Sequence, residues 1–525
     1  MFSRETTIKH ETVVSKATSV SIATLVSRTL GYTRDMLIAN YFGATMVADA
    51  FFVAYRIPNL LRRLLGEGSL STSFIPVYTQ YLTRKDEKES IRLIKVVFGA
   101  FSLLFIVLVV LGIIFAPLIV SLIAPGFRGD PEKFRMTVYL TRIMFPFLMA
   151  IGLGAITLGI LNSWRMFVVP AIAPVMLSIS EILVILFICP FMRLPISGLA
   201  VGVLIGGFAQ LGFQLIPVLK RTRNLLPVFD FKHPGLKQVG RLMLPAVLGI
   251  SVMQINSFVD TICATLLETG SVTHLYYGNR LVQLPLALFG TAVATVALPM
   301  MSEDAARNKM DNMKDTFSFS IKTVSFLVMP AMVGLILLGN PLIRVLFERG
   351  RFITADTKAT ALILSCYAMG LFFFAGVKIV TSAFYSLQNT RTPVIIASLA
   401  MLLNVILNVV VISVDMIRFS LGASGLALAT SVSSAFNYLV LTAVFRKKYG
   451  PEEATRGLTG SIARHVLAAV IMGIAIFRLM SMTGSLSRYV VLPLMIITGG
   501  LIYIMISYAL AVPELKQVRN YFKKS

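Results

Sequence analysis

The sequence predicts an all-α, polytopic membrane protein with about 14 transmembrane helices. Of its 525 residues, 56% are hydrophobic and only 14% are charged, a balance typical of chains that cross a bilayer many times. The net charge of +24 comes from lysines and arginines that lie mostly between the apolar runs. This placement favours a membrane topology signal over nucleic-acid binding, so we expect no nucleic acid among the partners.

The apolar segments justify the helix count one by one. Their approximate spans are 17–42, 46–82, 93–124, 134–162, 166–190, 196–219, 240–268, 272–302, 316–346, 355–387, 392–414, 422–446, 460–482 and 488–512. Several are longer than a straight span needs, so we expect tilted or kinked helices, or ends that project from the bilayer.

The basic residues set the orientation of these helices. An even number of spans puts both termini on one side of the membrane. The loops on that side hold roughly 29 lysines and arginines, against about 10 on the other. The richest are Arg84–Lys95, Lys220–Arg241, Arg307–Lys322 and Arg446–Arg464. Both termini are therefore predicted to be cytoplasmic.

A weak internal repeat predicts the domain organisation. The stretch Asp49–Pro58 aligns with Thr273–Val282, and Asp35 aligns with Asp260. This relates the first and second helices to the seventh and eighth. Two facing, pseudo-symmetric six-helix lobes are expected, with a ligand site between the repeats. The predicted parts are an N-terminal lobe (1–222), a cytoplasmic linker (223–240), a C-terminal lobe (241–450), and the last two helices with a cytoplasmic tail (451–525).

The first two segments carry charges where a membrane helix should have few. These are Arg28, Arg34, Asp35, Asp49, Arg56, Arg62, Arg63 and Glu67. An arginine at the centre of a lipid-facing helix costs roughly 2.5–3.5 kcal/mol on insertion scales. Several of these side chains should therefore face a polar cavity, in which cations exceed acids. An anionic ligand would suit that cavity, and the planar guanidinium fork fits phosphate oxygens well.

Other polar residues within the apolar segments leave alternatives open. Arg280 lies opposite Arg56 in the repeat and would add a cation from the second lobe. Lys378 is a further intramembrane cation that could instead pair locally or snorkel. The alternative for the arginines is a structural role, in which Asp35, Asp49 and Glu67 form ion pairs that hold helices together.

Candidate cation ligands are weaker. Asn404 and Asn408 are one helical turn apart and could coordinate a cation with Asp260. More often such residues form hydrogen bonds between helices.

Catalytic motifs do not occur in the sequence. The four histidines are scattered through loops and segment ends, and neither HExxH nor a Walker A loop is present. The three cysteines lie in apolar stretches without metal-ligand spacing. We therefore expect neither an enzyme nor a cofactor.

Three motifs carry a resemblance to a known family. Residues Asp49–Gly68, followed by Ser73–Pro76, resemble the signature of the MurJ/MviN lipid II flippases. Ser27–Asp35 matches the family's first-helix motif, and Ala383–Pro393 matches its loop between the tenth and eleventh helices. The resemblance covers essentially the whole chain, including the extra final pair of helices.

The resemblance implies a transporter of the multidrug/oligosaccharidyl-lipid/polysaccharide exporter superfamily. It implies movement of lipid II, the undecaprenyl-pyrophosphate-linked peptidoglycan precursor, from the cytoplasmic to the outer leaflet of the bacterial inner membrane. The family's cavity arginines match Arg28, Arg34, Arg62 and Arg280, and its charge-partner acids match Asp35, Asp49 and Glu67. Expected partners are lipid II, membrane lipids, and the cell-wall synthesis and division machinery, around a monomeric chain.

Two departures from the family pattern limit these implications. Many relatives carry an acid three residues after the eighth-helix arginine, where this chain has Gln283. Relatives with a sodium site have an acid near the position of Asn408, so sodium coupling is in question. Alternative functions are a polysaccharide-unit flippase, a drug exporter, a membrane glycosyltransferase and a division scaffold. The long second-helix motif, the absence of catalytic motifs and the intramembrane arginines argue against them.

Overall fold

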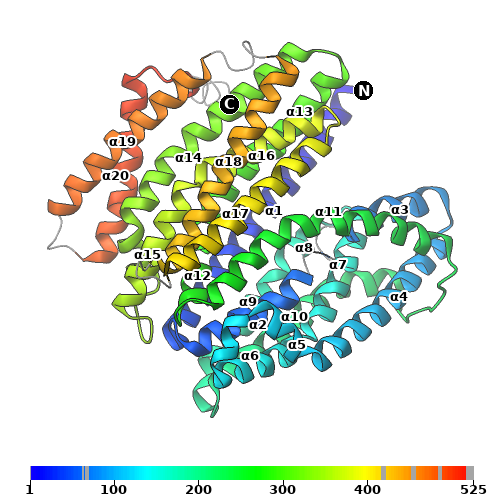
Figure 1. The fold of residues 1–525 in the computed structure, drawn as a ribbon. Coiled ribbons are helices and arrows are strands. Elements are labelled where there is room, and N and C mark those ends of the chain that lie inside the picture. The colour runs from blue at the N-terminus through cyan, green and yellow to red at the C-terminus, as the bar shows by residue number, and fades with distance from the viewer. Residues whose placement is uncertain are drawn as a thin grey trace. The chain divides into compact units, whose positions relative to one another are not determined.

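The computed structural model describes residues 2–61, 64, 70–415, 421–450, 457–482 and 487–515. These residues form α-helices joined by short connections, and none of them lies in a β-strand. The prediction of an all-α membrane protein is therefore confirmed. Contacts divide the chain into an N-terminal unit, Met1–Thr269, and a C-terminal unit, Gly270–Ser525. Figure 1 shows the helices in chain order.

The N-terminal unit begins with the long helix α1. Its elements are α1 (Phe2–Phe42), α2 (Met46–Leu61), α3 (Ser71–Arg84), α4 (Glu87–Ile114), α5 (Ala116–Ile123), the 3₁₀-helix η2 (Pro125–Gly129), α6 (Pro131–Met144), α7 (Phe147–Ser163), α8 (Val168–Ile172), α9 (Pro174–Phe187), the 3₁₀-helix η3 (Cys189–Phe191), α10 (Pro195–Thr222) and α11 (Pro234–Thr265). Helix α1 ends at Phe42, and the positive φ of the next residue, Gly43, allows the chain to turn into α2.

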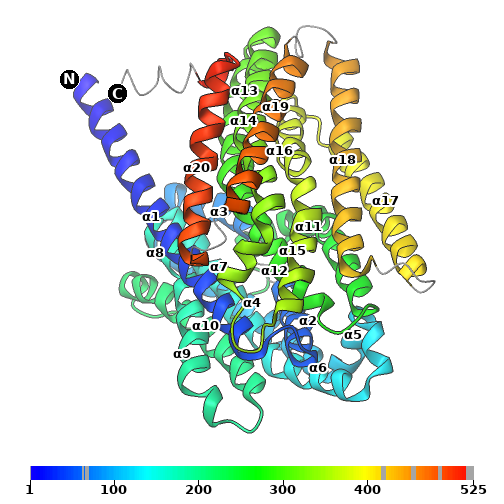
Figure 2. The same ribbon diagram turned by 90° about the vertical axis from the view of Figure 1, so that its left-hand side faces the viewer.

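The C-terminal unit contains the remaining long helices. They are α12 (Ser271–Pro285), the π-helical turn η4 (Leu286–Thr291), α13 (Ala292–Ala306), α14 (Met310–Leu346), α15 (Thr354–Met369), α16 (Leu371–Ser386), α17 (Arg391–Asp415), α18 (Gly422–Tyr449), α19 (Leu458–Met482) and α20 (Arg488–Ala509). Helices α19 and α20 pack on each other and on α14, as Figure 2 shows.

Eleven helical spans among the described residues are long and apolar enough to cross a membrane. They correspond to eleven of the segments expected from the sequence. The other three expected segments, 17–42, 46–82 and 240–268, contain α1, α2 with α3, and α11. The sequence of 46–82 is partly outside the described residues, so the total of 14 spans stays a prediction.

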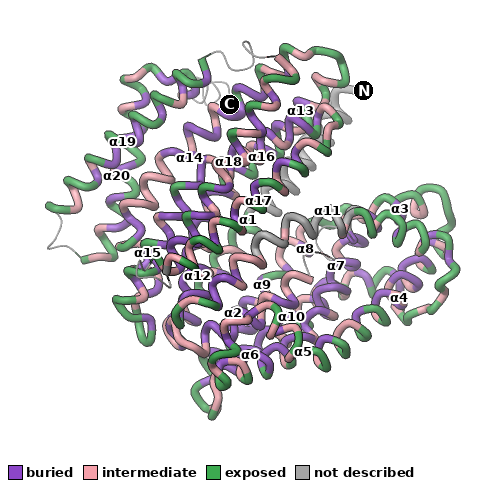
Figure 3. Tube along the Cα trace, in the orientation of Figure 1, coloured by how far each residue is buried: buried purple, intermediate pink, exposed green. Residues whose placement is uncertain are grey.

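Burial differs sharply from helix to helix (Figure 3). In the most apolar window of the α6–α7 span 78% of residues are buried, whereas in α17 only 22% are. Close packing of α7 against α4 depends on glycine, because a Cβ at Gly152 would lie 2.2 Å from the Phe105 ring. Apolar side chains left exposed, such as Leu402 and Val409 on α17, suit contact with lipid.

Helix α11 is grouped differently from the sequence prediction. The predicted C-terminal lobe began at residue 241, but α11 packs on α3, α4 and η2 and belongs to the N-terminal unit. The predicted lobe boundary comes from a repeat in the sequence, whereas the boundary of the unit comes from contacts in the structure. The two boundaries therefore need not coincide. The predicted lobe and linker boundaries stay predictions.

Candidate functional site

A buried charge cluster surrounds Arg34 in the N-terminal unit. Arg34 on α1 is only 7% exposed. Its Nη2 and Nε donate to Asp35 Oδ1 over 2.7 and 3.0 Å, and its Nη1 donates to Glu181 Oε1 over 3.3 Å. Asp35 and Glu181 are themselves buried, at 0% and 2% exposure. One guanidinium thus faces two carboxylates, one from its own helix and one from α9.

The guanidinium of Arg34 uses different nitrogen atoms for its two carboxylate partners. Neighbouring side chains on a helix point about 100° apart, and the long Arg34 side chain spans that angle to bring Nε and Nη2 to Asp35 Oδ1. That arrangement uses the Nε edge of the guanidinium and leaves Nη1 directed toward α9, which packs on α1. The fork therefore bridges two helices of the same unit.

A second buried ion pair joins α2 to α6. Lys133 Nζ lies 2.9 Å from Asp49 Oδ2, and the two residues are 5% and 1% exposed. The ammonium also lies 4.2 Å from the centroid of the Phe127 ring, a cation–π distance. Asp49 is held in the first turn of α2, where an acid interacts favourably with the helix dipole.

The C-terminal unit contains a corresponding pair between α12 and α15. His274 Nε2 lies 3.4 Å from Asp356 Oδ1, and His274 Nδ1 lies 3.4 Å from Thr360 Oγ1. Asp49 and His274 both lie in the first turn of their helices, and so do Lys133 and Asp356. Helices α2 and α12 are the ones that the sequence repeat equates. The position of the pair is therefore repeated, with the acid on the other helix.

The comparisons with known proteins agree with one another. The family model described as lipid II flippase MurJ matches residues 38–498. A protein of Vibrio cholerae named "Probable lipid II flippase MurJ" is 37% identical over 460 residues, covering 86% of each chain. A protein of Burkholderia cenocepacia named "Lipid II flippase MurJ" is 33% identical and covers 82% of this chain and 83% of its own.

This chain belongs to the lipid II flippase MurJ family. A solved MurJ structure, described as an inward closed conformation, matches with a TM-score of 0.78 and 30% identity, covering 93% of this chain and 97% of that one. A multidrug MATE-family transporter of the MOP superfamily in an inward-facing conformation matches with a TM-score of 0.64 at 16% identity, covering 80% and 94%. The second likeness concerns the fold alone. The chain is thus a multi-pass member of a family of membrane transporters.

The residues matched to the MurJ-family arginines are distributed as follows. Arg28 is half-buried on α1, Arg34 is buried in its carboxylate cluster, and Arg280 is half-buried on α12. Arg62 lies outside the described residues, as do Arg63 and Glu67. Arg28 and Arg34 belong to the N-terminal unit, and Arg280 belongs to the C-terminal unit. The predicted cavity, which needs all of them together, therefore stays a prediction.

Gln283, which stands where many relatives have an acid, is an exposed amide on α12. Gln283 Nε2 donates to Asn279 Oδ1 at 3.5 Å, one turn back along α12. Lys378 on α16 is half-buried and donates to Thr291 Oγ1 at 2.9 Å. Thr291 ends the π-helical turn η4, an irregularity that often accompanies functional positions.

The candidate cation ligands lie in separate units. Asp260 is half-buried on α11, whereas Asn404 and Asn408 are fully buried on α17. Asn408 Nδ2 donates to Asn404 Oδ1 at 2.9 Å, and Asn404 Nδ2 donates to the hydroxyls of Thr430 and Ser433 on α18 at 3.3 Å. Asn404 thus joins α17 to α18, and Asn408 donates to Asn404 from within α17. The described residues contain no group of three or more His, Cys, Asp or Glu side chains placed to hold a metal ion.

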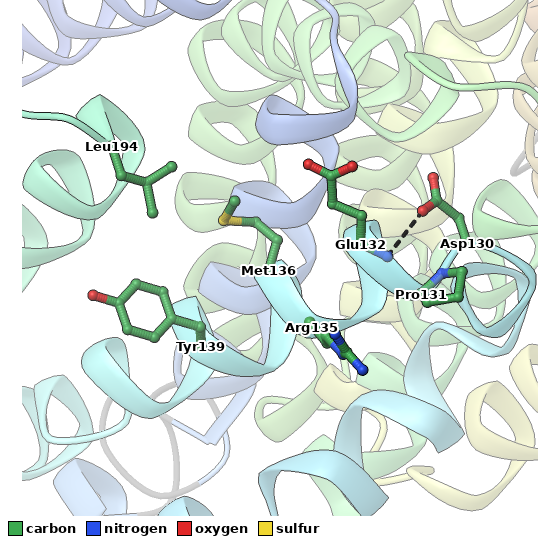
Figure 4. Close-up of a pocket in the computed structure, with 7 residues that line it drawn as sticks. All are labelled: Asp130, Pro131, Glu132, Arg135, Met136, Tyr139 and Leu194. Atoms are coloured by element: carbon green, nitrogen blue, oxygen red, sulfur yellow. Dashed lines mark hydrogen bonds between the residues drawn. The ribbon is translucent and has the colours of Figure 1, made fainter.

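A surface pocket of about 730 Å³ has none of these residues in its lining. Figure 4 shows its lining, which comes from the start of α6 and from Leu194. Asp130 caps α6 by accepting from the backbone N–H groups of Glu132 and Lys133. Those N–H groups are therefore already satisfied, and the pocket includes none of the residues expected from the sequence.

Sequence reasoning missed Glu181 and Lys133. Glu181 is an acid in an otherwise apolar segment, so the rule that singled out the first two helices could have found it. Lys133 gave no such signal. It precedes its apolar segment and reads as one more loop cation, and only the fold brings it to Asp49.

Proposed function

We propose that this chain moves lipid II from the inner to the outer leaflet of the cytoplasmic membrane by alternating access. The observation that carries the proposal is the match to the lipid II flippase family over residues 38–498. Transport of this kind makes and breaks no bond in the substrate, so the chain acts as a transporter and not as an enzyme. It works as a monomer, with both termini cytoplasmic and with the cell-wall synthesis and division machinery as neighbours.

The anionic diphosphate of lipid II is bound by Arg28, Arg34, Arg62 and Arg280. Guanidinium groups can replace the hydration of phosphate oxygens with paired, charge-assisted hydrogen bonds. The half-buried state of Arg28 and Arg280 is compatible with this role, because such side chains are neither fully hydrated nor locked in the core. The polyprenyl tail stays in lipid while the polar headgroup crosses.

Arg34 takes part by exchanging partners. Its three donor nitrogens are engaged by Asp35 and Glu181 in this conformation. A diphosphate presents the same kind of acceptor as a carboxylate, so it can compete for that fork. The two acids hold Arg34 in position until substrate arrives and take it back after release. Asp49 and Glu67 are further charge partners.

The function is tested by measuring the leaflet accessibility of labelled lipid II in cells that contain or lack this protein. We expect labelled substrate to reach the outer leaflet only when the protein is present. Transfer of a soluble drug or of another lipid-linked glycan, without lipid II transfer, would instead favour a multidrug exporter or polysaccharide flippase.

The binding residues are tested by Arg28→Ala, Arg34→Ala, Arg62→Ala and Arg280→Ala, each in a flippase-depleted strain. Each variant should fail to restore growth while accumulating normally in the membrane. Lysine replacements keep the charge but lose the planar fork, so we expect partial or no rescue. Full function in two or more of the alanine variants would contradict the role assigned to these residues.

A further inference from the structure

The connection between α10 and α11 is docked on α4 and does not hang free. The backbone N–H of Val228 donates to the carbonyl oxygen of Lys95 over 3.2 Å, and Arg92 Nη2 lies 3.2 Å from Asp230 Oδ2. Gly99 makes this approach possible, because a Cβ there would lie 2.8 Å from the Val228 carbonyl oxygen. The connection, seen beside α4 in Figure 1, therefore has a fixed position on the N-terminal unit.

His233 fixes the far end of the same connection. The N–H of Gly235 donates to His233 Nδ1 over 3.1 Å, which caps the first turn of α11. Since Nδ1 accepts, Nε2 carries the proton and donates to Glu89 Oε1 over 3.1 Å. His233 is only 3% exposed. The segment is thus held at both ends by contacts with the N-terminal half of α4.

Between these anchors the side chains alternate. Val228 and Asp230 are half-buried and contact α4, whereas Phe229 and Phe231 are 59% and 55% exposed. Alternation of this kind is what an extended chain lying on a surface produces. The contacts with α4 therefore turn two phenylalanine rings outward, where the N-terminal unit does not cover them.

Helix α4 shows at what depth these rings lie. Its charged residues are confined to Glu87–Lys95, and the residues from Val96 to Phe115 carry no charge. The connection crosses α4 at Lys95 and Gly99, where the charged turns give way to the apolar run. That boundary is where a membrane helix passes from the headgroup region into hydrocarbon, the level at which aromatic rings are favourable.

The charges of residues 220–241 themselves are almost all positive. Asp230, the one acid between residues 220 and 241, is paired with Arg92. The exposed cations of the same stretch are Lys220, Arg221, Arg223, Lys232, Lys237 and Arg241. Basic residues beside apolar side chains at a membrane boundary attract anionic lipid headgroups.

We propose that residues 220–241 form a binding surface for anionic phospholipids of the adjoining leaflet. Phe229 and Phe231 insert at the boundary between headgroups and acyl chains, and the surrounding lysines and arginines bind the phosphates. With the topology proposed above, this is the cytoplasmic leaflet. The bound lipids hold α4 and the start of α11 at a defined depth. The surface needs no lipid II, so its test does not depend on flippase activity.

The test uses the full-length protein in vesicles and the fact that the chain has one tryptophan, Trp164. Trp164→Phe is combined with Phe229→Trp or, in a second variant, with Phe231→Trp. Vesicles contain phosphatidylcholine and phosphatidylglycerol at equal amounts, with bromine on the acyl chains of one or the other. Bromine near the glycerol end should quench both tryptophans more than bromine deep in the chain. Brominated phosphatidylglycerol should quench at least twofold more than brominated phosphatidylcholine.

Two further measurements make the outcome decisive. Adding Lys232→Gln and Lys237→Gln should remove at least half of the preference for the anionic lipid while quenching by bulk lipid persists. The matched control replaces Lys309 and Lys358, exposed lysines elsewhere in the chain, and should leave the preference unchanged. Quenching by aqueous iodide and not by lipid bromine would overturn the proposal, because the rings would then face water or a soluble partner. Equal quenching by both lipids would overturn the anionic preference.

Discussion

Arg34 forms two buried ion pairs in this structure, and the function proposed above gives it a second role as a substrate-binding residue. A buried ion pair contributes little net stability, yet removing one partner typically costs about 3–5 kcal/mol, because a charge is left without compensation. With carboxylates on two sides, Arg34 is over-supplied with partners in this conformation. In the proposed exchange, release of Arg34 to a phosphate leaves Asp35 and Glu181 with less compensation, and this favours return of the arginine after the substrate departs.

Asp35→Asn tests this exchange. It keeps the shape of the side chain and removes one negative charge, so the diphosphate meets a weaker competitor. We expect lipid II to bind as tightly or more tightly, with the gain bounded by one charged hydrogen bond, about 1.5–3 kcal/mol. Leaflet transfer should be slower, because Arg34 is returned less readily. Binding and transfer are measured separately on purified and reconstituted protein.

Glu181→Gln should act in the same direction, since Glu181 competes for the remaining nitrogen of the same guanidinium. Glu132→Gln, at an exposed acid of the same unit, is the matched control and should change neither quantity. Loss of lipid II binding in a well-folded Asp35→Asn or Glu181→Gln protein would show that the acids assist binding and do not compete for Arg34.

At the scale of elements, the two units repeat a pair of charged or polar partners at matching places, buried in the N-terminal unit and partly buried in the C-terminal one. Asp49 and Lys133 join α2 to α6, and His274 and Asp356 join α12 to α15. Each pair ties together the first turns of two neighbouring helices. The first pair is shorter, at 2.9 Å against 3.4 Å, and its acid is more deeply buried.

These differences predict unequal coupling energies. A double-mutant cycle with Asp49→Asn and Lys133→Met should give the larger coupling, within the 0.5–3 kcal/mol range of residues in direct contact. The cycle with Asp356→Asn and His274→Gln should give the smaller. Thermal unfolding of the purified protein provides the measurement. A stronger coupling in the C-terminal pair would mean that distance and burial do not set the strength of these pairs.

A buried histidine on α19 links the last two helices to α14. His465 on α19 lies 3.1 Å from Ser325 Oγ on α14 and 3.2 Å from Glu514 Oε2, beyond the end of α20. Burial alone would raise the pKa of the Glu514 carboxyl, but hydrogen bonds from His465 and from the backbone, with the charges of His465 and Lys322, bring the pKa below its usual value.

The lowered pKa sets the direction of a pH effect. A carboxyl whose pKa is lower in the folded than in the unfolded protein adds stability above its unfolded pKa, and that stability is lost as the pH falls through the folded value. Glu514→Gln should therefore lower the melting temperature at pH 7, by an amount equivalent to about 1–3 kcal/mol. The difference from wild type should shrink toward zero below pH 4. A difference that is independent of pH would show that the charge of Glu514 contributes nothing.

At the scale of the whole molecule, the sequence predicted what depends on composition and spacing. The lengths of the apolar runs are enough to predict an all-α membrane fold. In lipid every backbone N–H and C=O group needs a hydrogen-bond partner within the protein, and a helix supplies these partners within a single segment. Arg34, Asp35 and Asp49 could be recognised as candidate site residues because placing a charge inside a membrane helix costs free energy. The partners Glu181 and Lys133 depend on which helices pack together, and that information is spread over the whole chain.

The packing of α11 on the N-terminal unit depends on the whole chain for a similar reason. Its repeat partner is α1, which suggested that it opens the second lobe. Its packing on α3 and α4 follows from the docked connection before it, which brings the start of α11 to the first turns of α4. Repeat symmetry predicts equivalent elements, but a short, anchored connection decides which neighbours an element contacts.

Membrane topology is the remaining whole-molecule prediction, and the distribution of lysine and arginine decides which side of the membrane the termini face. Lysine and arginine near helix ends are retained on the cytoplasmic side during insertion, and the loops on the side of the termini hold roughly three times as many as the others. Single cysteines at Asn224 and Asn312 should therefore face the cytoplasm, and those at Glu268 and Ala355 the outside. All four positions are exposed. Cys189, Cys263 and Cys366 are buried, and they are replaced by alanine to give a clean background.

Intact cells are treated with a membrane-impermeant maleimide, before and after permeabilisation. The cysteines at 268 and 355 should react at once, and those at 224 and 312 only after the membrane is opened. Because an even number of spans fixes both termini together, reaction of 224 and 312 in intact cells would reverse the orientation of the entire chain. Reaction of only one member of either pair would instead mean that the number of spans between them is odd where we expect it to be even.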